Sequence, residues 1–111
     1  MTNGQGTVKW MAPEILSNAP YTTSADIYSF SLVIWEVITQ QPFYEEFKFN
    51  SQIEIHVVNH NLRPDVSAFT PAARSVLEKT WAPQPGMRPT ASSLLTILSK
   101  LSPSDLQMSQ E

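Results

Sequence analysis

The stretch TTSADIYSFSLVIWEVITQ, residues 22–40, decides the fold. Apolar residues occupy nearly every side of a helix drawn through it, and its length favours a helix over a strand. Ser24 is expected to cap this helix and Asp26 to lie in its first turn, before Gln41 and Pro42 end it. A helix that is apolar all round is typical of a protein interior, but the chain offers only three other plausible helices to surround this one, so we expect about two of its large side chains to stay open.

Two further helices are expected next to this stretch. On the amino-terminal side, Pro13 suits the first turn of a short helix, and the helix dipole stabilises Glu14 beside it. On the other side, PFYEEFKF (residues 42–49) reads as an aromatic-rich loop. The following segment, residues 51–59, predicts a helix capped by Ser51, although its apolar pattern would also fit a strand.

The carboxyl-terminal part predicts two amphipathic helices. Thr70 is expected to cap the first, over residues 71–81, in which Val76, Leu77 and Trp81 share one face. The second covers residues 90–101 and carries a stripe made of four leucines and one isoleucine. Residues 103–111 are polar and are expected to form a disordered tail. The fold class predicted from these elements is all-α.

Composition excludes several classes of function. The 111 residues suffice for one domain, and the net charge of −3 leaves no basic stripe for nucleic acid. The absence of cysteine excludes disulfides, thiolate catalysis and cysteine-bound zinc. The most apolar run is shorter than a bilayer requires and contains Glu36, so we expect no membrane segment in this chain.

Three motifs now stand in order along the chain. They are GTVKWMAPEIL at residues 6–16, SADIYSFSLVIWEV at residues 24–37, and an Arg-Pro pair followed by W and PQPGMRPT at residues 63–90. In this order they resemble the carboxyl-terminal half of a eukaryotic protein kinase domain, most of all the tyrosine-kinase-like group of Ser/Thr kinases. The resemblance implies the helical lower half of the large lobe, an incomplete domain that covers residues 1–102.

The same resemblance implies which functional parts this chain holds. It places Met1 inside the activation segment, so the glycine-rich loop, the strand lysine, the His-Arg-Asp loop and the Asp-Phe-Gly metal site would all precede it. The complete domain would use ATP and magnesium to phosphorylate Ser or Thr in proteins involved in signalling. For this chain alone we expect no cofactor and no catalysis. Its partners would be a protein substrate or a regulatory protein, in the cytoplasm or on the cytoplasmic side of a membrane kinase.

The resemblance also assigns a substrate-binding loop. Gly6, Thr7 and Trp10 match the loop that receives the residue next to the phosphorylated hydroxyl. Thr7 is typical of Ser/Thr kinases, whereas the VKW that follows also resembles the tyrosine type; without the resemblance, the same residues are a plain Gly-Thr turn. Thr2 would lie in the activation segment as a phosphorylation site, or it is an ordinary loop threonine.

Three residues match structural positions of the family. Glu14 and Arg88 match a buried ion pair of the family. Without the resemblance, Glu14 would be an acid stabilised by the helix dipole and Arg88 an arginine exposed to solvent. Asp26 matches an aspartate that accepts hydrogen bonds from the catalytic loop, or it serves only the start of its own helix. Ser31 departs from the family pattern, which has glycine there, and its hydroxyl can bond back to the preceding turn.

Two other features have alternative interpretations. His56 and His60 would share one helical face, but with no third ligand we expect no metal site. Glu45 and Glu46 are expected to be a solubilising edge and not an acid/base pair. Two alternatives to a kinase fragment remain for the whole chain, a non-catalytic interaction module derived from a kinase and an unrelated helical bundle.

Overall fold

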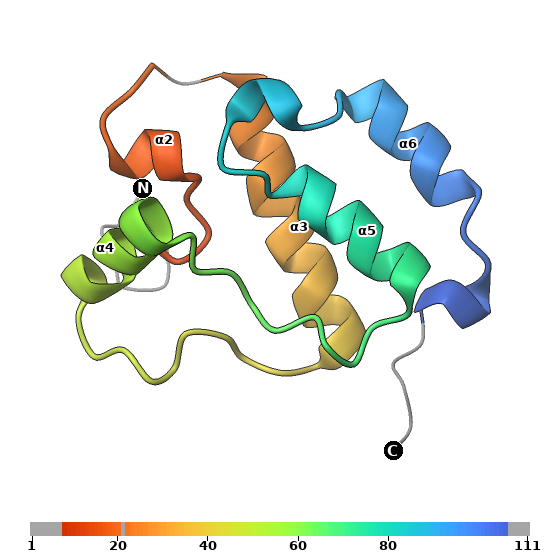
Figure 1. Cartoon of the computed structure of the whole chain (residues 1–111), viewed down its shortest axis with the longest axis horizontal. Helices are drawn as coiled ribbons and strands as arrows, with labels where there is room; N and C mark the ends of the chain where they lie inside the picture. Colours follow the sequence, from red (N-terminus) through yellow and green to blue (C-terminus); the bar gives the residue numbers. More distant parts are fainter. Residues whose placement is uncertain (1–7, 21, 107–111) are drawn as a thin grey trace.

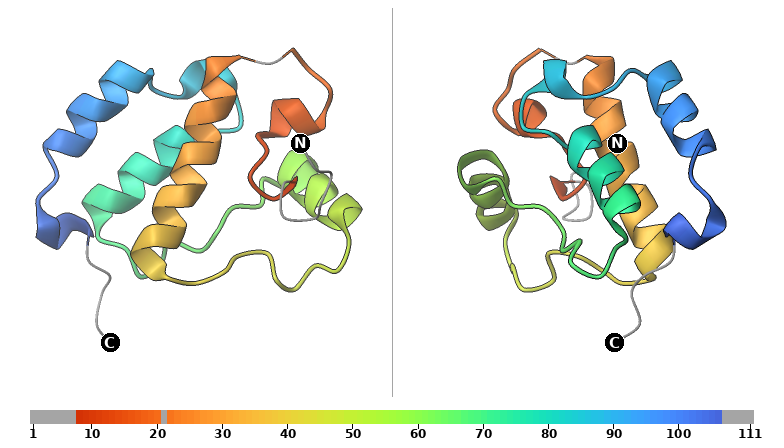
Figure 2. Two further views of the ribbon diagram at one scale, coloured as in Figure 1. Left: turned by 180° about the vertical axis from the view of Figure 1, so that it is seen from behind. Right: turned by 45° about the vertical axis from the view of Figure 1, so that its right-hand side comes forward.

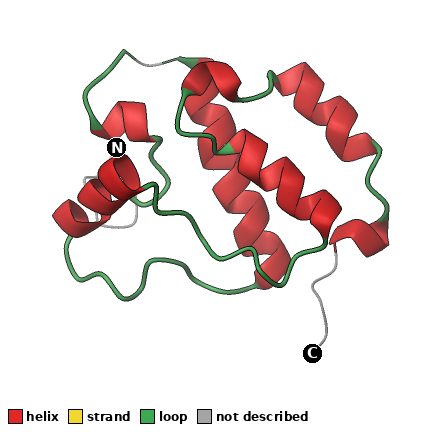
Figure 3. Ribbon diagram, viewed as in Figure 1, coloured by secondary structure: helices red, strands yellow, loops and turns green. Residues whose placement is uncertain are grey.

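A computed structural model describes residues 8–20 and 22–106, and every regular element in these ranges is a helix (Figures 1 and 3). The predicted all-α fold class is therefore confirmed. The elements, of which η1 and η2 are 3-10 helices, are α2 (Pro13–Leu16), α3 (Thr23–Thr39), α4 (Asn50–His60), α5 (Pro71–Thr80), η1 (Pro85–Met87), α6 (Ala91–Ser99) and η2 (Pro103–Leu106).

Helix α3 is the central element of the molecule. Helix α5 packs against it and runs in the opposite direction, while α2 and α4 pack together on one side and α6 lies on the other (Figures 1 and 2). Tyr28, Leu32 and Trp35 of α3 are buried in the core with Phe69 and Leu77 from the α5 region. None of the helices among the described residues has both the length and the apolar character needed to cross a membrane.

The outer face of α3 is exposed, as expected for a chain with too few helices to surround it. Phe30, Val33 and Val37 keep 47%, 43% and 63% of their surfaces accessible. The reason is geometric, because the other described helices cover only the face that carries Tyr28 and its buried neighbours. Ser31 lies in that buried face, and its Oγ donates to the Tyr28 carbonyl at 2.6 Å, the local bond expected of a hydroxyl there.

The exposed face of α3 and the leucines of α6 form a continuous apolar groove, referred to below as the α3–α6 groove. Two adjoining pockets of about 480 and 400 Å³ make it up, and they share Phe30 and Leu98. Only Leu94 of the predicted α6 stripe is fully buried, whereas Leu95 is 69% exposed. Ile97, Leu98 and Leu101 are half-buried, so the stripe is only partly covered by packed neighbours.

Two predicted helix caps are wrong. Ser24 lies inside the first turn of α3, which begins at Thr23 without a side-chain cap. Ser51 lies inside α4, which starts one residue earlier. There the Gln52 side chain does the capping, because its Oε1 accepts the backbone N–H groups of Lys48 (3.0 Å) and Phe49 (3.2 Å). A side chain that reaches back from inside the helix replaces the predicted serine.

Thr70 caps α5 as predicted, since its Oγ1 accepts the Ala73 N–H at 3.3 Å. The same oxygen donates to the Asp105 carbonyl at 2.6 Å and so ties the α5 start to η2. The Asp105 carboxylate in turn accepts the Ser102 N–H at 2.8 Å. Pro103–Leu106, assigned from sequence to the disordered tail, is thus a short capped helix; residues 107–111 lie outside the described residues.

Candidate functional site

The candidate site is built around the turn that contains Trp10. The Met11 N–H donates to the Val8 carbonyl at 3.0 Å, which closes the turn. Ser29 Oγ on α3 donates to the Trp10 carbonyl at 2.7 Å, and the Trp10 ring meets Phe43 edge-on at 5.7 Å between centroids. These contacts fix the turn between the central helix and the loop that follows it.

Lys9 extends from this turn over aromatic rings. Its Nζ lies 4.9 Å from the Trp10 centroid and 4.7 Å from the Phe43 centroid, positions in which the ring faces attract a cation. The same Nζ lies 3.5 Å from a Glu45 carboxylate oxygen and donates to the Phe43 carbonyl, also at 3.5 Å. Only 16% of the Lys9 side chain is exposed, against 67% for Glu45, so the ion pair stands at the surface end of a mostly buried lysine.

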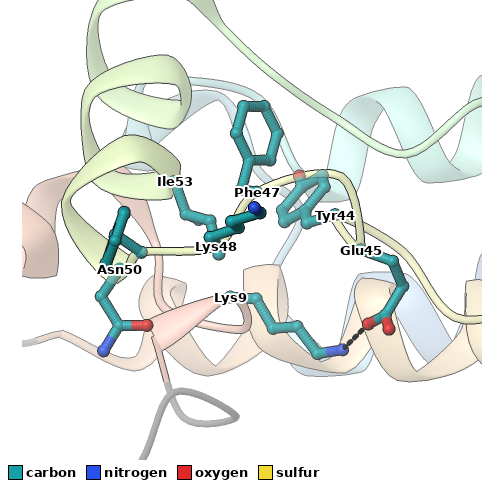
Figure 4. Close-up of a pocket in the computed structure, with 8 residues that line it drawn as sticks. Lys9, Tyr44, Glu45, Phe47, Lys48, Asn50 and Ile53 are labelled. Carbon is teal, nitrogen blue, oxygen red and sulfur yellow. Dashed lines mark ion pairs between the residues drawn. The ribbon is translucent and has the colours of Figure 1, made fainter.

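A pocket of about 240 Å³ opens beside Lys9, between the turn and the start of α4 (Figure 4). Its walls come from Lys9, the loop between α3 and α4, and the first residues of α4; that loop and helix contribute Tyr44, Glu45, Phe47, Lys48, Phe49, Asn50 and Ile53. The close-up shows Lys9 reaching Glu45 on one side of the pocket, with Asn50 on the other. The Asn50 Oδ1 is buried and makes no hydrogen bond among the described residues.

Consecutive aromatic contacts connect this pocket to the core. Phe43 meets Trp35 at 5.9 Å and Tyr44 at 4.7 Å, and Phe47 lies between Tyr44 and His56, at 6.5 and 4.9 Å. The three pairs among Trp35, Phe43, Tyr44 and Phe47 are edge-to-face, which favours one arrangement of the rings. The loop therefore presents its pocket-facing residues from a fixed aromatic support.

The Tyr44 side chain is held in the interior. Its backbone has a φ of 62°, a left-handed conformation uncommon for a residue with a side chain. Its hydroxyl donates to the Leu62 carbonyl at 3.2 Å, and burial raises the pKa of this phenol well above its usual range. Tyr44 therefore stays neutral and acts here as a packing and hydrogen-bonding group.

Glu14 and Arg88, paired by resemblance in the sequence, meet in the structure. Two parallel hydrogen bonds join them, from Arg88 Nη1 to Oε2 at 2.8 Å and from Nη2 to Oε1 at 2.9 Å. The Arg88 side chain is fully buried and that of Glu14 is 10% exposed. Burial is the largest single effect and raises the pKa of Glu14, but the Arg88 hydrogen bonds, a backbone hydrogen bond and the charges of Arg88 and Arg63 together lower it by more, so its pKa lies below the ordinary value.

Arg63 belongs to the same buried region, although the sequence reasoning gave it no role. Its guanidinium lies 5.0 Å from the Tyr28 ring centroid, and that of Arg88 lies 5.1 Å from the same centroid. Arg63 Nε also donates to the Trp81 carbonyl at 2.9 Å. The only signal in the sequence was its place in the Arg-Pro motif, which does not reveal its partners.

The remaining predicted residues are distributed as follows. Asp26 is exposed in the first turn of α3, at one end of the α3–α6 groove and away from the Lys9 pocket. Gly6 and Thr7 of the predicted substrate loop lie outside the described residues, as does Thr2. Trp10 is thus the one member of that loop whose surroundings the structure describes.

The described side chains form no cluster of the kind that holds a metal ion. Within residues 8–20 and 22–106, no three His, Cys, Asp or Glu side chains come together in a way that could hold a metal ion. His56 and His60 do lie close, with ring centroids 5.4 Å apart, but His56 Nδ1 bonds to the Gln52 carbonyl at 2.7 Å and they have no third ligand. The Lys9 pocket is smaller than most small-molecule sites.

The family model and the similar proteins all identify the same family, the protein kinases. The family model described as protein tyrosine and serine/threonine kinase matches residues 1–98, which is most of the chain. Serine/threonine-protein kinase STY17 of Arabidopsis thaliana is 35% identical over 102 residues, and serine/threonine/tyrosine-protein kinase HT1 of the same plant is 36% identical over 97. Dual specificity protein kinase shkA of Dictyostelium discoideum is 32% identical over 98 residues.

These alignments cover nearly all of this chain but a small part of each relative. They include 91%, 86% and 87% of the chain for STY17, HT1 and shkA, against 18%, 24% and 19% of those proteins. The chain therefore spans less than a quarter of the length of each of these three relatives.

Proposed function

Because the chain belongs to the protein tyrosine and serine/threonine kinase family, we propose that it is the part of a kinase domain that binds the protein substrate. The complete domain would transfer phosphate from ATP to Ser and Thr hydroxyls. The observation that carries this proposal is the Lys9 pocket beside the Trp10 turn (Figure 4).

The pocket has the chemistry needed to hold a short peptide. Phe47 and Ile53 offer an apolar wall, and Lys48 places a positive charge beside it. The buried Asn50 Oδ1 would accept a hydrogen bond from a peptide N–H, because it has no partner among the described residues. The aromatic rings of this loop are already held in place by contacts with one another. Binding of a peptide therefore costs less conformational entropy than it would at a mobile loop.

Specificity for Ser and Thr is proposed from Thr7 and from the relatives. The names of the relatives include serine/threonine, serine/threonine/tyrosine and dual specificity kinases. The threonine at this loop position, Thr7, is typical of kinases that phosphorylate Ser or Thr, so it favours these residues over Tyr as the acceptor of phosphate. We propose no phosphate transfer by the described side chains, among which no three His, Cys, Asp or Glu could hold a metal ion together.

A second function is favoured by the outer surface of α4. Ile55 and Val58 of this helix are 51% and 39% exposed. Exposed apolar residues on one helix are typical of protein-binding surfaces. We therefore also propose a non-catalytic role in which α4 binds a regulatory protein, and we place both functions in the cytoplasm.

Fluorescence anisotropy with labelled degenerate peptides tests the substrate site. A library centred on Ser should bind the chain, and the Lys48→Ala and Asn50→Ala variants should each weaken that binding about fivefold or more. Lys79→Ala, which removes an exposed lysine on α5, is the matched control and should change nothing. Equal binding by all four proteins would overturn the site, and stronger binding of a Tyr-centred library would overturn the Ser/Thr preference.

A further inference from the structure

The ammonium group of Lys9 is held in place by neutral groups. Its Nζ lies 4.9 Å from the Trp10 ring centroid and 4.7 Å from that of Phe43, and it donates to the Phe43 carbonyl at 3.5 Å. Ring faces and a carbonyl attract a cation without carrying a net negative charge. The position of the lysine is therefore fixed by these groups, while its charge still requires a carboxylate as partner.

Glu45 supplies that carboxylate through a contact that is easily replaced. Its Oε2 lies 3.5 Å from Lys9 Nζ, and 67% of its side chain is exposed, against 16% for Lys9. A strong hydrogen bond between charged groups is shorter, about 2.7–2.9 Å, and an ion pair with an exposed partner contributes little to stability. A carboxylate brought by a ligand can therefore take the place of Glu45 without any movement of the lysine.

The pocket beside Lys9 suits an acidic side chain. Its lining contains two lysines, Lys9 and Lys48, and one acidic residue, Glu45 (Figure 4). Phe47 and Ile53 add apolar surface for methylene groups. Its volume of about 240 Å³ lies below the range of most small-molecule sites, so it suits one side chain and not a longer segment. Glutamate combines the required methylene groups and negative charge.

Asn50 adds a contact for the peptide backbone. Its buried Oδ1 has no hydrogen-bond partner among the described residues, and Asn50 lies across the pocket from the pair of Lys9 and Glu45 (Figure 4). The Oδ1 can accept a hydrogen bond from a backbone N–H, whereas the ammonium group donates to a carboxylate. A peptide that makes both contacts would cross the pocket with its acidic side chain directed at Lys9.

We propose that the Lys9 pocket selects substrates with Asp or Glu close to the phosphorylated Ser or Thr, and that the substrate carboxylate replaces Glu45 on Lys9. This preference rests on the substrate site proposed above and adds the chemical class that the site favours. Glu45 then acts as a competitor within the chain. It lowers the affinity for an acidic peptide, because it must first be displaced from Lys9.

Fluorescence anisotropy with the full 111-residue chain and paired peptide libraries tests this preference. Each library keeps Ser at its centre and fixes one flanking position as Glu or, in the matched library, as Gln, which has a similar shape without the charge. At one or two flanking positions, the Glu library should bind about fivefold tighter than the Gln library. This ratio should decrease at about 0.5 M salt, because dissolved ions screen the attraction.

Variants of the paired residues test the exchange. Lys9→Met removes the charge and keeps an apolar side chain against the rings, so the ratio should fall below about twofold, whereas Lys9→Arg should keep the preference. Glu45→Gln removes the competing carboxylate and should raise the ratio about threefold. Glu46→Gln is the matched control, because Glu46 is exposed beside Glu45 but does not line the pocket, and it should leave the ratio unchanged.

Four results would overturn the proposal. Equal binding of the Glu and Gln libraries at every position would remove the acidic preference and leave the substrate site in place. A ratio that Lys9→Met leaves unchanged would mean that another group attracts the acid. Equal effects of Glu45→Gln and Glu46→Gln would contradict the exchange, and this comparison does not depend on the mostly buried Lys9. Failure of every library to bind would overturn the substrate site itself and the preference with it.

Discussion

Arg88 joins three separate segments of the chain. Its guanidinium donates two hydrogen bonds to Glu14, one to the Ser24 carbonyl at 3.0 Å and one to the Ala82 carbonyl at 2.9 Å. All of its donor nitrogens are thus used, as a buried guanidinium requires. The pair connects α2, the start of α3 and the turn before α6.

Removal of either partner of this pair should be strongly destabilising. Glu14→Ala and Arg88→Ala should each lower the free energy of unfolding by about 3–5 kcal/mol, because each leaves an uncompensated charge in the interior. The double variant should lose less than the sum, with a coupling of about 1–3 kcal/mol. Urea unfolding of the four proteins measures this cycle, and strict additivity would mean that the two side chains do not interact.

The same pair should give stability a defined pH dependence. The pKa of Glu14 is lower in the folded chain than its ordinary value of 4.5, so the folded state binds fewer protons at this group than the unfolded state. Its contribution is therefore fully present above pH ~4.5 and is lost as the pH falls through the folded pKa below that value.

Comparison with Glu14→Gln isolates this effect. The difference in unfolding free energy between wild type and Glu14→Gln should be constant from about pH 7 to pH 5.5 and should shrink as the pH is lowered further. Denaturant unfolding at several pH values gives this difference directly. A gap that stays the same down to pH ~3 would show that the carboxylate of Glu14 is not the group involved.

At the residue scale, the sequence predicted a contact between two side chains where both of them belong to motifs of the family. It did so for Glu14 and Arg88, which lie 74 positions apart. It could not show that Lys9 would lie over Phe43, or that Arg63 and Arg88 would both approach Tyr28, because such contacts depend on how distant segments pack. The predicted roles of Gly6 and Thr7 stay predictions, since both lie outside the described residues.

At the scale of elements, Thr70 connects α5 to η2 through one hydroxyl. It accepts the Ala73 N–H and donates to the Asp105 carbonyl. Thr70→Ala should therefore lower stability by about 1–2 kcal/mol, because the cap and the tie to η2 are lost together. Thr70→Ser keeps the hydroxyl and should cost less than half of that. Thermal unfolding compares the two, and equal losses would show that the hydroxyl bonds contribute nothing.

The helices were largely predictable, but their first residues were less so. Pro71 after Thr70 and the start of α6 after Thr90 follow from local capping chemistry, and both threonines cap as that chemistry requires. The segment of α4 was predicted as a helix, although its apolar pattern would also fit a strand, and the structure has it as a helix that packs against α2. Ser51 lost the capping position because Gln52 reaches back to the two preceding N–H groups.

At the scale of the whole molecule, the exposed α3–α6 groove should limit the stability of a single copy. Full burial of a large apolar side chain contributes about 1.5–3 kcal/mol, so four half-exposed ones forgo on the order of 3–6 kcal/mol. Phe30, Val33, Val37 and Leu95 are such residues. That loss is comparable to the total stability of a small domain, about 5–15 kcal/mol.

The melting temperature of the chain should therefore be low. The chain is expected to unfold below about 60 °C or to aggregate, because the exposed groove leaves its core incompletely covered. Differential scanning calorimetry at several concentrations, with size-exclusion chromatography, measures both quantities. A sharp transition above ~60 °C from a clean monomer would mean that the described helices close the core without a partner.

We propose that this chain supplies substrate binding to a kinase domain and that other parts of the domain supply the groups that transfer phosphate. Backbone-amide NMR of the labelled chain tests it most directly, by addition of a Ser-centred peptide library and, separately, of magnesium and ATP. The peptides should shift the signals of Lys9, Trp10, Lys48 and Asn50, while ATP should produce no saturable change below about 1 mM. Saturable binding of ATP in that range, or peptide shifts confined to other parts of the chain, would contradict the claim.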